Sequence, residues 1–349
     1  MRKEQDLESP LDLVNTSVGQ EDIVTSFNPE TFEEYLGQAT IKEKLKVYTH
    51  AAKKRGEPLD HLLLFGPPGL GKTTLAKVMA HELEASIKIT SAPVLERSGD
   101  LVAILSNLAP KEVLFIDEIH RLPKQVEEIL YSAMENFCVD MIVGSGAGAQ
   151  SIRLPISPFT LIGATTKTAL LSGPLQTRFG IVERLDFYTA DELAEIVLQN
   201  AAFCKISIEK EAAEKIGSSA RGTPRIVKRL FRRVRDFAQF HEHAVIDVII
   251  AEKALQFLGI DEQGLNTLDR QILVHLLKDF DGGPVGLETL AAMTGEDKET
   301  LEDYCEPFLI RLGLLQKTSR GRMIPTQKIR QLRMKLLGEN PKIQTGLFE

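Results

Sequence analysis

The sequence predicts an α/β protein of three parts: a parallel sheet covered by helices and carrying an inserted β-hairpin, then a helical domain, then a winged helix. At 349 residues the chain is too long for one ordinary core. Strand-length apolar runs alternate with helix-like stretches in the first half, strand signals stop after residue 188, and a basic hairpin follows helices near the end. We therefore place the domains at residues 1–188, 189–259 and 260–349.

The parallel sheet is predicted from short apolar runs that are followed by stretches with helical spacing. Residues 61–65, 113–116 and 159–164 have the length and composition of buried strands. Residues 73–83 and 124–134 follow the first two of these runs and carry apolar side chains at helical intervals. Repeated strand–helix alternation is typical of a parallel sheet that is covered on both faces.

A β-hairpin interrupts this pattern between residues 137 and 158. Residues 139–143 and 151–154 are β-like, and the glycine-rich residues 144–148 between them are expected to form a turn. The apolar side chains of the hairpin could belong to the core or form an exposed docking patch, and the sequence leaves both open.

The second half of the chain is predicted to be mainly helical. Helical patterning runs over residues 190–258 and breaks near residues 221–224. Three further helical stretches follow residue 259, at residues 268–277, 287–293 and 300–312. Short β-like segments then flank residues 318–321, and three helices followed by a basic hairpin are typical of a winged helix.

The charge distribution favours a nucleic-acid-binding end. The formal net charge is −7, which taken alone counts against nucleic-acid binding. No Asp or Glu lies between residues 311 and 335, although this stretch holds many bases. These bases are Arg311, Lys317, Arg320, Arg322, Lys328, Arg330, Arg333 and Lys335.

Composition points to a cytoplasmic protein. No apolar run approaches the roughly 18 residues of a membrane span, and the acidic first 30 residues lack the apolar segment of a secretory signal. Residues 1–26 are expected to be a mobile tail. Cys138, Cys204 and Cys305 are scattered, which argues against a zinc site or a disulfide framework and fits inert thiols in a reducing compartment.

A phosphate-binding loop is the most specific motif. Residues 66–73 read Gly-Pro-Pro-Gly-Leu-Gly-Lys-Thr and match G-x-x-x-x-G-K-[ST], with a strand before them and a helix after. The glycines let backbone N–H groups turn towards phosphate oxygens. Lys72 is expected to reach the β- and γ-phosphates of ATP, and the Thr73 hydroxyl to bind Mg²⁺.

Two acids at the end of the second apolar run complete the catalytic motif. Asp117 would lie at the carboxyl edge of the sheet, where it could hold Mg²⁺, and Glu118 would orient and deprotonate the attacking water. A solvated acidic turn is the alternative, which pairing with the phosphate loop disfavours. His120 is expected to make a polar contact and not to bind a metal.

Three further residues could act on the γ-phosphate. Thr166 follows an apolar strand, where it would sense the phosphate or cap the next turn. Arg178 and Arg225 could each stabilise developing charge, or form a surface ion pair. Arg225 also opens a basic run over residues 225–235, which suits a subunit interface, a DNA-binding face or a solvated helix.

The order of these motifs resembles the RuvB family of AAA+ ATPases, the bacterial Holliday-junction branch-migration motors. The features that carry the resemblance are the phosphate loop, Asp117-Glu118-Ile119-His120-Arg121-Leu122, the strand-end Thr166, Pro174-Leu175-x-x-Arg178-Phe179, Arg221-Gly222-Thr223-Pro224-Arg225 and the basic winged-helix end. It covers residues 32–323. It implies a P-loop AAA+ domain with the inserted hairpin, a helical lid domain and a winged-helix head domain.

The resemblance also implies an activity. A hexameric ring would encircle duplex DNA and hydrolyse ATP between subunits to drive branch migration of Holliday junctions in recombination and repair. Thr166 would be the first sensor, Arg178 the finger given to a neighbour's ATP, and Arg225 the second sensor. The implied nucleotide contacts are Phe27, Asn28, Gly69, Gly71, Lys72, Thr73, Thr74, Glu135, Asn136, Phe137, Arg178, Tyr188 and Arg225.

Partners follow from the same resemblance. The hairpin of residues 139–154 would dock a RuvA-type junction-binding protein, and a RuvC-type resolvase would join the complex. Lys317, Arg320 and Arg322 would contact DNA phosphates in the wing. Such contacts carry no sequence code, which suits a motor that moves along any DNA.

Two positions depart from the family pattern. The family usually has an Arg before the Pro that leads into residues 34–38, whereas this chain has Asn28 before Pro29. If that Arg contacts nucleotide in relatives, Asn28 loses a charge and nucleotide affinity is expected to differ. Lys317 stands where an Arg is expected and still suits a phosphate contact as a point charge.

Three other functions compete with the motor. A replication initiator would also combine an ATPase with a winged helix, but would bind one DNA sequence and hydrolyse ATP slowly. A clamp-loader subunit would usually have Ser-Arg-Cys where this chain has Thr177-Arg178-Phe179. A protein unfoldase would need an aromatic pore loop, which we do not identify here, and would not need the basic end.

Overall fold

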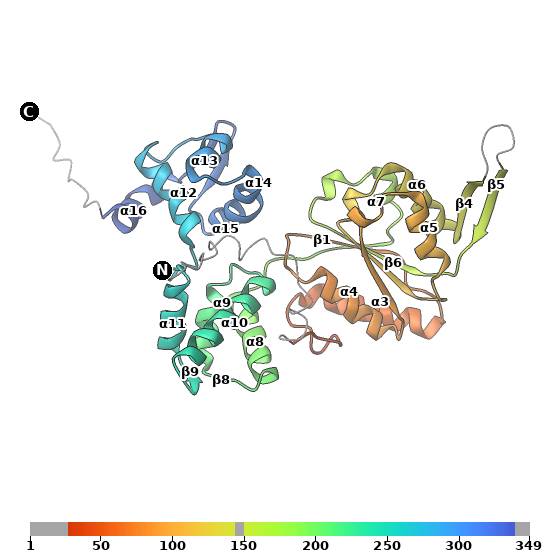
Figure 1. The fold of residues 1–349 in the computed structure, drawn as a ribbon, viewed down its shortest axis with the longest axis horizontal. Helices are drawn as coiled ribbons and strands as arrows, with labels where there is room; N and C mark the ends of the chain where they lie inside the picture. The colour runs from red at the N-terminus through yellow and green to blue at the C-terminus, as the bar shows by residue number, and fades with distance from the viewer. Residues whose placement is uncertain (1–26, 144–149, 339–349) are drawn as a thin grey trace, which may run out of the picture. The chain divides into compact units, whose positions relative to one another are not determined.

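The computed structural model describes residues 27–143 and 150–338 and divides into two compact units, Met1–Asp247 and Val248–Glu349 (Figure 1). The expected tail (residues 1–26) and the whole of the expected hairpin turn (residues 144–148) lie outside the described residues. Among the helices that are described, none is both long and apolar enough to cross a membrane.

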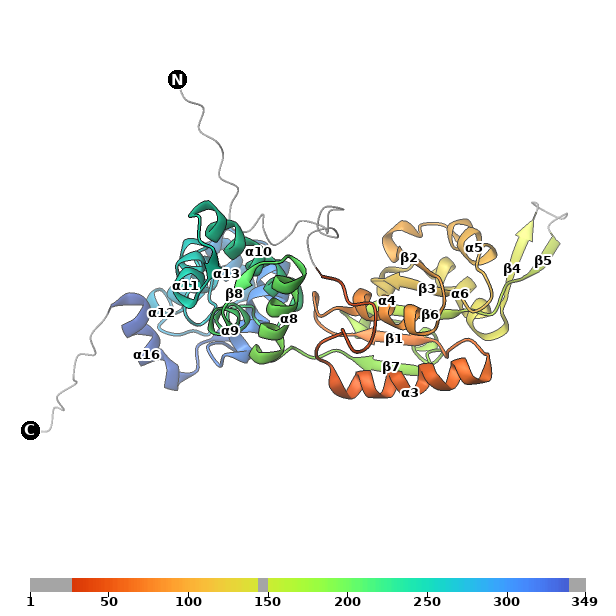
Figure 2. The same ribbon diagram turned by 90° about the horizontal axis from the view of Figure 1, so that it is seen from below.

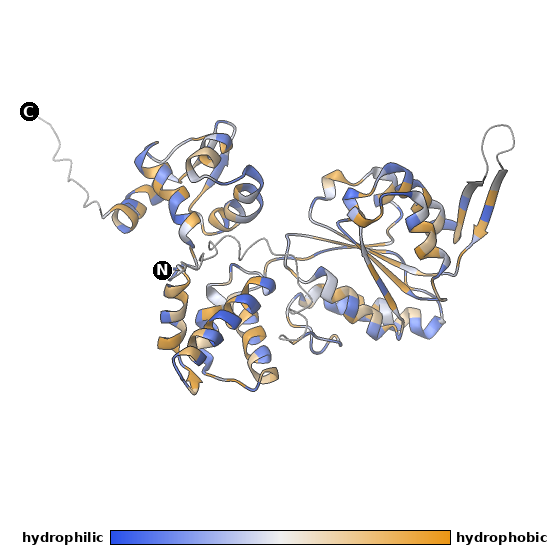
Figure 3. Cartoon of the chain, in the orientation of Figure 1, coloured by the Kyte–Doolittle hydropathy of each residue, from blue (hydrophilic) through white to orange (hydrophobic). Residues whose placement is uncertain are grey.

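A five-stranded parallel sheet forms the centre of the first unit, in the order β2-β3-β6-β1-β7. Its strands are β1 (Leu62–Phe65), β2 (Ile87–Ser91), β3 (Val113–Asp117), β6 (Thr160–Thr165) and β7 (Ile181–Arg184). The three inner strands are the three apolar runs that the sequence predicts, and they are almost fully buried. Figure 3 shows these central strands mostly in the hydrophobic colour.

The two edge strands were not predicted, because neither carries a continuous apolar run. Strand β7 alternates between buried and exposed residues, so that Val182 faces outward, and β2 is only partly buried along its length. A strand at the edge of a covered sheet needs fewer apolar side chains than a central one.

Helices cover both faces of the sheet (Figures 1 and 2). Helices α3 and α4 lie on one face, and α5, α6 and α7 lie on the other, where their apolar side chains share a core with β3 and β6. The bounds are α3 (Ala39–Arg55), α4 (Lys72–Glu82), α5 (Ser98–Ser106), α6 (Lys124–Asn136) and α7 (Gly173–Gln176).

The inserted hairpin consists of β4 (Cys138–Val143) and β5 (Gln150–Pro155), which pair antiparallel and extend away from the sheet. Val139 at its base is fully buried in the core, whereas Ile152 is 48% exposed further out. The two possibilities that the sequence leaves open, core and exposed patch, therefore apply to different parts of the hairpin. Its base belongs to the core, and its outer part carries an exposed apolar side chain.

The first unit ends in a bundle of three helices: α8 (Ala190–Phe203), α9 (Lys210–Ser218) and α10 (Pro224–Phe240). A short parallel ladder joins β8 (Ser207–Ile208) to β9 (Val245–Ile246). Thr189 begins α8 with a capping box to Glu192. Pro224 at the first position of α10 fixes where that helix begins.

The second unit has the predicted winged-helix order. Helix α11 (Val248–Phe257) precedes α12 (Thr267–Lys278), α13 (Leu287–Thr294) and α14 (Lys298–Thr300), and a π-helical turn (Leu301–Cys305) leads into α15 (Glu306–Arg311). The wing is the antiparallel pair of β10 (Gln316–Thr318) and β11 (Gly321–Met323), and α16 (Thr326–Leu337) closes the unit.

Candidate functional site

The phosphate loop (residues 66–73) lies between β1 and α4. Gly66, Gly69 and Gly71 have φ of +143°, +78° and +93°, which L side chains rarely adopt. A Cβ on Gly66 would meet the Leu185 carbonyl oxygen at 2.5 Å, and one on Gly69 would meet the Thr223 side chain at 2.7 Å. The glycines therefore allow both the backbone turn and the close approach of neighbouring segments, and the loop leads into the N-terminus of α4 as an anion site requires.

Lys72 is held inside this loop. Its Nζ donates to the carbonyl oxygens of Gly66 at 2.8 Å and of Pro67 at 2.9 Å. Burial lowers the pKa of Lys72 to about 8; the nearby Asp117 carboxylate acts in the other direction, and the positive charge of Arg225 lowers it further. The ammonium group is thus under-neutralised, which suits a site that receives phosphate.

The acidic pair lies where the sequence placed it. Asp117 is the last residue of β3, and its Oδ1 accepts a hydrogen bond from the Glu118 N–H at 2.9 Å. Glu118 adopts a left-handed conformation with φ of +49°, and its carboxylate pairs with Arg121 at 2.9 Å. Asp117 is close enough to Lys72 to influence its pKa, so the acid faces the phosphate loop.

The donor set here fits Mg²⁺ better than a metal with an all-protein shell. The described part of the chain contains no group of three or more His, Cys, Asp or Glu side chains that could hold a metal ion. Mg²⁺ commonly takes only one or two protein ligands and completes its shell with water and substrate phosphates. Thr73 and Asp117, the ligands expected from the sequence, would match that number.

The end of β6 places two threonines differently. The buried Thr165 ends the strand; its hydroxyl lies 2.9 Å from His120 Nδ1 and accepts from the Lys167 N–H at 3.0 Å. His120 makes the polar contact expected of it, and burial lowers its pKa. Thr166, the predicted sensor, follows the strand and is exposed.

The helical bundle brings a second cation to the phosphate loop. The backbone N–H of Arg225, at the start of α10, donates to the Gly69 carbonyl oxygen at 3.3 Å. The Arg225 side chain is exposed and forms no ion pair with any described residue, and its charge lowers the pKa of Lys72. Two cations without full counter-charges therefore converge on one glycine-rich loop.

An apolar pocket lies beside the phosphate loop, between α4 and the bundle. It encloses about 50 Å³, and its walls include Tyr35, Thr74, Tyr188, Pro224 and Lys228. The Tyr188 hydroxyl donates to the Tyr35 hydroxyl at 3.1 Å and to the Leu70 carbonyl oxygen at 3.3 Å, and burial raises the pKa of Tyr188 to about 12. Its lining combines aromatic and aliphatic side chains with polar ones that also include Glu34 and Gln199, and such a combination is typical of a small-molecule site.

The N-terminal end of the described chain borders this pocket. The Phe27 N–H donates to Asn200 Oδ1 at 3.0 Å, and the Phe27 ring packs on Phe203 with centroids 5.8 Å apart. Lys228 Nζ donates to the Phe27 carbonyl oxygen. Asn28 is exposed. Asn200 and Lys228 could not be identified from the sequence, because Asn200 is an amide inside a helix and Lys228 belongs to a longer basic run.

Arg178 lies in a separate cluster with α6. Its Nη2 pairs with Glu135 at 3.0 Å, its Nη1 donates to the Pro174 carbonyl oxygen at 2.7 Å, and its guanidinium stacks over the Tyr131 ring at 4.4 Å. The Tyr131 hydroxyl in turn donates to Glu127 at 2.5 Å. These contacts hold the arginine in one orientation. No motif in the sequence indicates the role of Tyr131.

This cluster lies near the amino ends of the parallel strands, whereas the phosphate loop lies at their carboxyl ends. The loop leaves β1 at its carboxyl end. Just before the amino end of β1, the His61 carbonyl oxygen accepts from the Ile181 N–H at 3.1 Å, and His61 Nε2 lies 3.1 Å from the Met134 carbonyl oxygen. Ile181 and Met134 are close in the chain to Arg178 and Glu135, so the cluster lies near this amino end. The four residues of β1 separate the two edges by about 13 Å. The structure therefore does not bring Arg178 or Glu135–Phe137 to the phosphate loop of the same subunit.

Asn136 and Phe137, which follow Glu135, differ in burial. Asn136 is exposed, whereas Phe137 ends α6 and packs its ring against Phe159 with centroids 6.2 Å apart. The Phe137 ring is partly buried and packs against the core on this face of the sheet.

The predicted DNA contacts in the wing differ from one another. Lys317 Nζ pairs with Glu306 at 2.6 Å and Glu302 at 3.1 Å, and Arg322 pairs with Glu306 at 2.7 Å. Burial acts to lower the pKa of Lys317, but the hydrogen bonds and charges of both acids raise it above its usual value. Arg320, at the turn of the wing, is exposed and has no ion-pair partner among the described residues.

Although residues 311–335 contain no Asp or Glu, several of their basic side chains pair with acids from other segments of the domain. Arg333 pairs with Asp281, and Lys335 lies 3.6 Å from Asp261. Sequence spacing missed this because each acid comes from an earlier segment of the domain. Arg320 is the candidate whose charge is available to a phosphate without breaking an ion pair.

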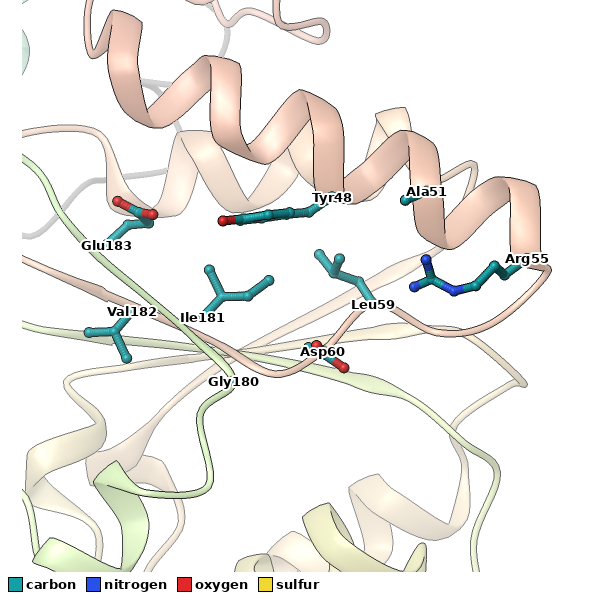
Figure 4. Close-up of a pocket in the computed structure, with 9 residues that line it drawn as sticks. All are labelled: Tyr48, Ala51, Arg55, Leu59, Asp60, Gly180, Ile181, Val182 and Glu183. Carbon is teal, nitrogen blue, oxygen red and sulfur yellow. The ribbon is translucent and has the colours of Figure 1, made fainter.

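A second cavity lies on the outer edge of the sheet and does not belong to the nucleotide site. It encloses about 430 Å³ between α3 and β7, and its walls include Tyr48, Arg55, Asp60 and Glu183 (Figure 4). Glu183 already pairs with Lys44 at 3.1 Å. This cavity borders the free edge of β7, whereas the phosphate loop lies at the carboxyl end of β1.

Comparisons with known proteins agree with this geometry. Residues 27–185 match the family model of the Holliday junction DNA helicase RuvB P-loop domain, residues 188–261 the RuvB AAA lid domain, and residues 262–333 the RuvB C-terminal winged helix domain. The solved structure of Thermotoga maritima RuvB, described as a Holliday junction branch migration motor, is 46% identical and covers 90% of this chain and 99% of its own, with a TM-score of 0.78. A Pro-to-Gly variant of the same protein matches at 46% identity over 90% of this chain and all of its own, with a TM-score of 0.79.

Proposed function

The chain belongs to the RuvB family of Holliday-junction branch-migration ATPases, and from this premise we propose that it moves four-way DNA junctions at the expense of ATP. The observation that carries the proposal is a divided active site. The phosphate loop, both acids and Arg225 meet at one edge of the sheet, and Arg178 is fixed at the other. A complete site then needs two subunits.

The phosphate side of the site does the binding and the activation of water. Lys72 and Arg225 neutralise the phosphates of ATP, and loop N–H groups and the N-terminus of α4 orient them. Thr73 and Asp117 would hold Mg²⁺, which would neutralise part of the negative charge of the phosphates. Glu118 orients the attacking water and takes its proton, and Thr166 senses the γ-phosphate.

Arg178, the proposed finger residue, acts on the nucleotide of the neighbouring subunit. Arg178 donates to the γ-phosphate bound by that neighbour and stabilises charge that develops in the transition state. Glu135, Asn136 and Phe137 would meet the same nucleotide at the interface. A closed ring gives every subunit one neighbour on each side, and a homo-hexamer is the assembly we propose.

The lid transmits the state of the nucleotide. Arg225 touches the phosphate loop through its backbone, and Tyr188 binds the Gly222 carbonyl oxygen with its own N–H at 3.0 Å. Phe27, Asn28, Gly69, Gly71, Thr74 and Tyr188 complete the proposed nucleotide contacts. A change at the γ-phosphate can thus reach α10 through Arg225, which is how hydrolysis would move the lid.

The remaining assignments rest on the family. The ATPase domain spans residues 1–188, the lid residues 189–259 and the DNA-binding head residues 260–349. Lys317, Arg320 and Arg322 contact DNA phosphates, and the hairpin of residues 139–154 docks a RuvA-type protein, with a RuvC-type resolvase in the same complex. The proposed compartment is the cytoplasm.

Strand release from a synthetic four-way junction tests the function. With ATP, Mg²⁺ and a RuvA-type partner, the chain should separate the junction into duplexes, and Lys72→Ala should abolish release because phosphate binding is lost. Lys210→Met, on the exposed face of α9, is the control. ATP hydrolysis without release under any of these conditions, together with a sequence-specific footprint on duplex DNA, would favour the replication initiator.

A further inference from the structure

Lys228 lines the small pocket beside the phosphate loop, and no sequence motif assigns a role to it. It lies on α10, four residues after Pro224, and both residues line the pocket together with Thr74 and Tyr188. Its Nζ donates to the carbonyl oxygen of Phe27. A cation from the lid thus reaches across to the segment that closes the other side of the pocket.

The charge of Lys228 is incompletely compensated. Burial lowers its pKa to about 8, and the positive charge of Arg232 lowers it further. No carboxylate of the described residues forms an ion pair with it. An ammonium group has three N–H donors and no acceptor, and the Phe27 carbonyl oxygen takes one of them, so donors remain for a ligand.

The position of this cation matters because of Asn28. Asn28, the next residue of the N-terminal segment, is exposed and uncharged. The Phe27 carbonyl group that binds Lys228 belongs to the peptide bond joining Phe27 to Asn28. The ammonium group therefore lies beside the backbone from which the side chain of residue 28 extends.

Resting on the ATP-binding function proposed above, we infer that Lys228 is a nucleotide-binding residue of this chain and supplies a positive charge from the lid, beside the uncharged Asn28. Its ligand is an acceptor atom on the base or ribose of ATP or ADP. The phosphates are assigned to the loop of residues 66–73. The neighbouring pocket that contains Lys228 is then left for the nucleoside.

ADP and inorganic tripolyphosphate both carry phosphates, but only ADP carries a nucleoside, so a role for Lys228 at the nucleoside affects ADP alone. Titration calorimetry on the full chain would measure the Kd of ADP and of inorganic tripolyphosphate for the unchanged chain and for Lys228→Met. Loss of a hydrogen bond from a charged donor should weaken ADP roughly tenfold or more. Tripolyphosphate binding should not change, because Lys228 does not reach the phosphates.

Restoring the charge from the other side is the more demanding test. Asn28→Arg added to Lys228→Met should recover most of the lost ADP affinity. The same Asn28→Arg change in the unchanged chain should bring little gain, because two cations would then compete for one position. Lys228→Gln, which keeps a donor for the Phe27 carbonyl oxygen but no charge, should behave like Lys228→Met if the charge matters.

Two controls keep the result interpretable. Lys210→Met removes an exposed lysine of α9 and should leave both Kd values unchanged, and thermal unfolding should show that each variant is folded. Equal weakening of ADP and tripolyphosphate by Lys228→Met, or no change for either ligand, would overturn the inference while leaving the proposed function intact. Failure of the unchanged chain to bind ADP would instead overturn the proposed function, and this inference with it.

Discussion

At the scale of single residues, the nucleotide site is a place where positive charge is concentrated before any phosphate arrives. Lys72 is buried and bonded only to carbonyl oxygens, and Arg225 lies over the same loop without an ion-pair partner among the described residues. Desolvation lowers the pKa of Lys72 to about 8, so near that pH the free site holds its proton only part of the time. Phosphate binding therefore restores a charge that the fold itself does not favour.

Proton uptake on nucleotide binding follows from this. At pH 8.5 Lys72 is mostly deprotonated in the free chain, and the phosphates raise its pKa, so ADP binding should take up protons. At pH 6.5 the lysine is already protonated and uptake from it should vanish. Calorimetry at each pH in two buffers of different ionisation enthalpy measures the uptake. The pKa of Lys228 is also about 8, so Lys228→Met should reduce the uptake without abolishing it.

An absence of buffer dependence at pH 8.5 would contradict this account. It would mean that Lys72 is already fully protonated in the free site, and that the burial and the nearby Arg225 do not lower its pKa as described.

At the scale of elements, the wing shows that neighbouring basic side chains can have different roles. Glu306, at the start of α15, is 3% exposed and receives both Lys317 and Arg322. Arg322 is therefore partly a structural residue that ties β11 to α15. Arg320 lies beyond this network at the turn between the strands, where a DNA phosphate can reach it.

Two substitutions separate these roles. Arg320→Ala should weaken DNA binding, lower the slope of log K against log salt by about 1, and leave stability unchanged. Arg322→Ala removes the bidentate partner of a buried carboxylate and should destabilise the winged helix by about 3 kcal/mol. Salt-dependent DNA binding and denaturant unfolding of the full chain measure the two effects. Equal stability of both variants would show that the Arg322–Glu306 pair contributes little.

The inner elements could be predicted from the sequence because their signals are local. Strands β1, β3 and β6 are continuous apolar runs, and the glycines of residues 66–73 are required by backbone geometry within the loop itself. The edge strands β2 and β7 lack that signal, because each is only half covered.

The contacts that tune the site could not be predicted, because they join distant parts of the chain. Glu135 meets Arg178 across 43 residues, Lys228 meets Phe27 across 201, and Lys317 and Arg322 find their acids in α15 and the turn before it. Nothing in the local spacing of these residues indicates a partner. The motifs indicate which residues carry the chemistry, but only the folded structure shows which of their charges already form ion pairs.

At the scale of the whole molecule, the central claim is that one subunit carries two half-sites. The phosphate loop lies at the carboxyl end of β1, and Arg178 is anchored by Glu135, Pro174 and Tyr131 near its amino end. No small movement of Arg178 can bridge the about 13 Å between these edges. Catalysis is then a property of the interface between subunits.

Mixing two inactive variants tests this most directly. Arg178→Ala keeps a complete phosphate side but offers no finger, and Glu118→Gln keeps its finger but cannot activate water. Each alone should lose ATPase activity by a factor of about 10³. In mixed rings, an Arg178→Ala subunit that faces the finger of a Glu118→Gln subunit has a complete site. Hydrolysis should therefore return on mixing and be greatest near equal proportions. If the mixture is as inactive as each variant alone, although the subunits are shown to exchange, Arg178 does not act on its neighbour and the divided site is wrong.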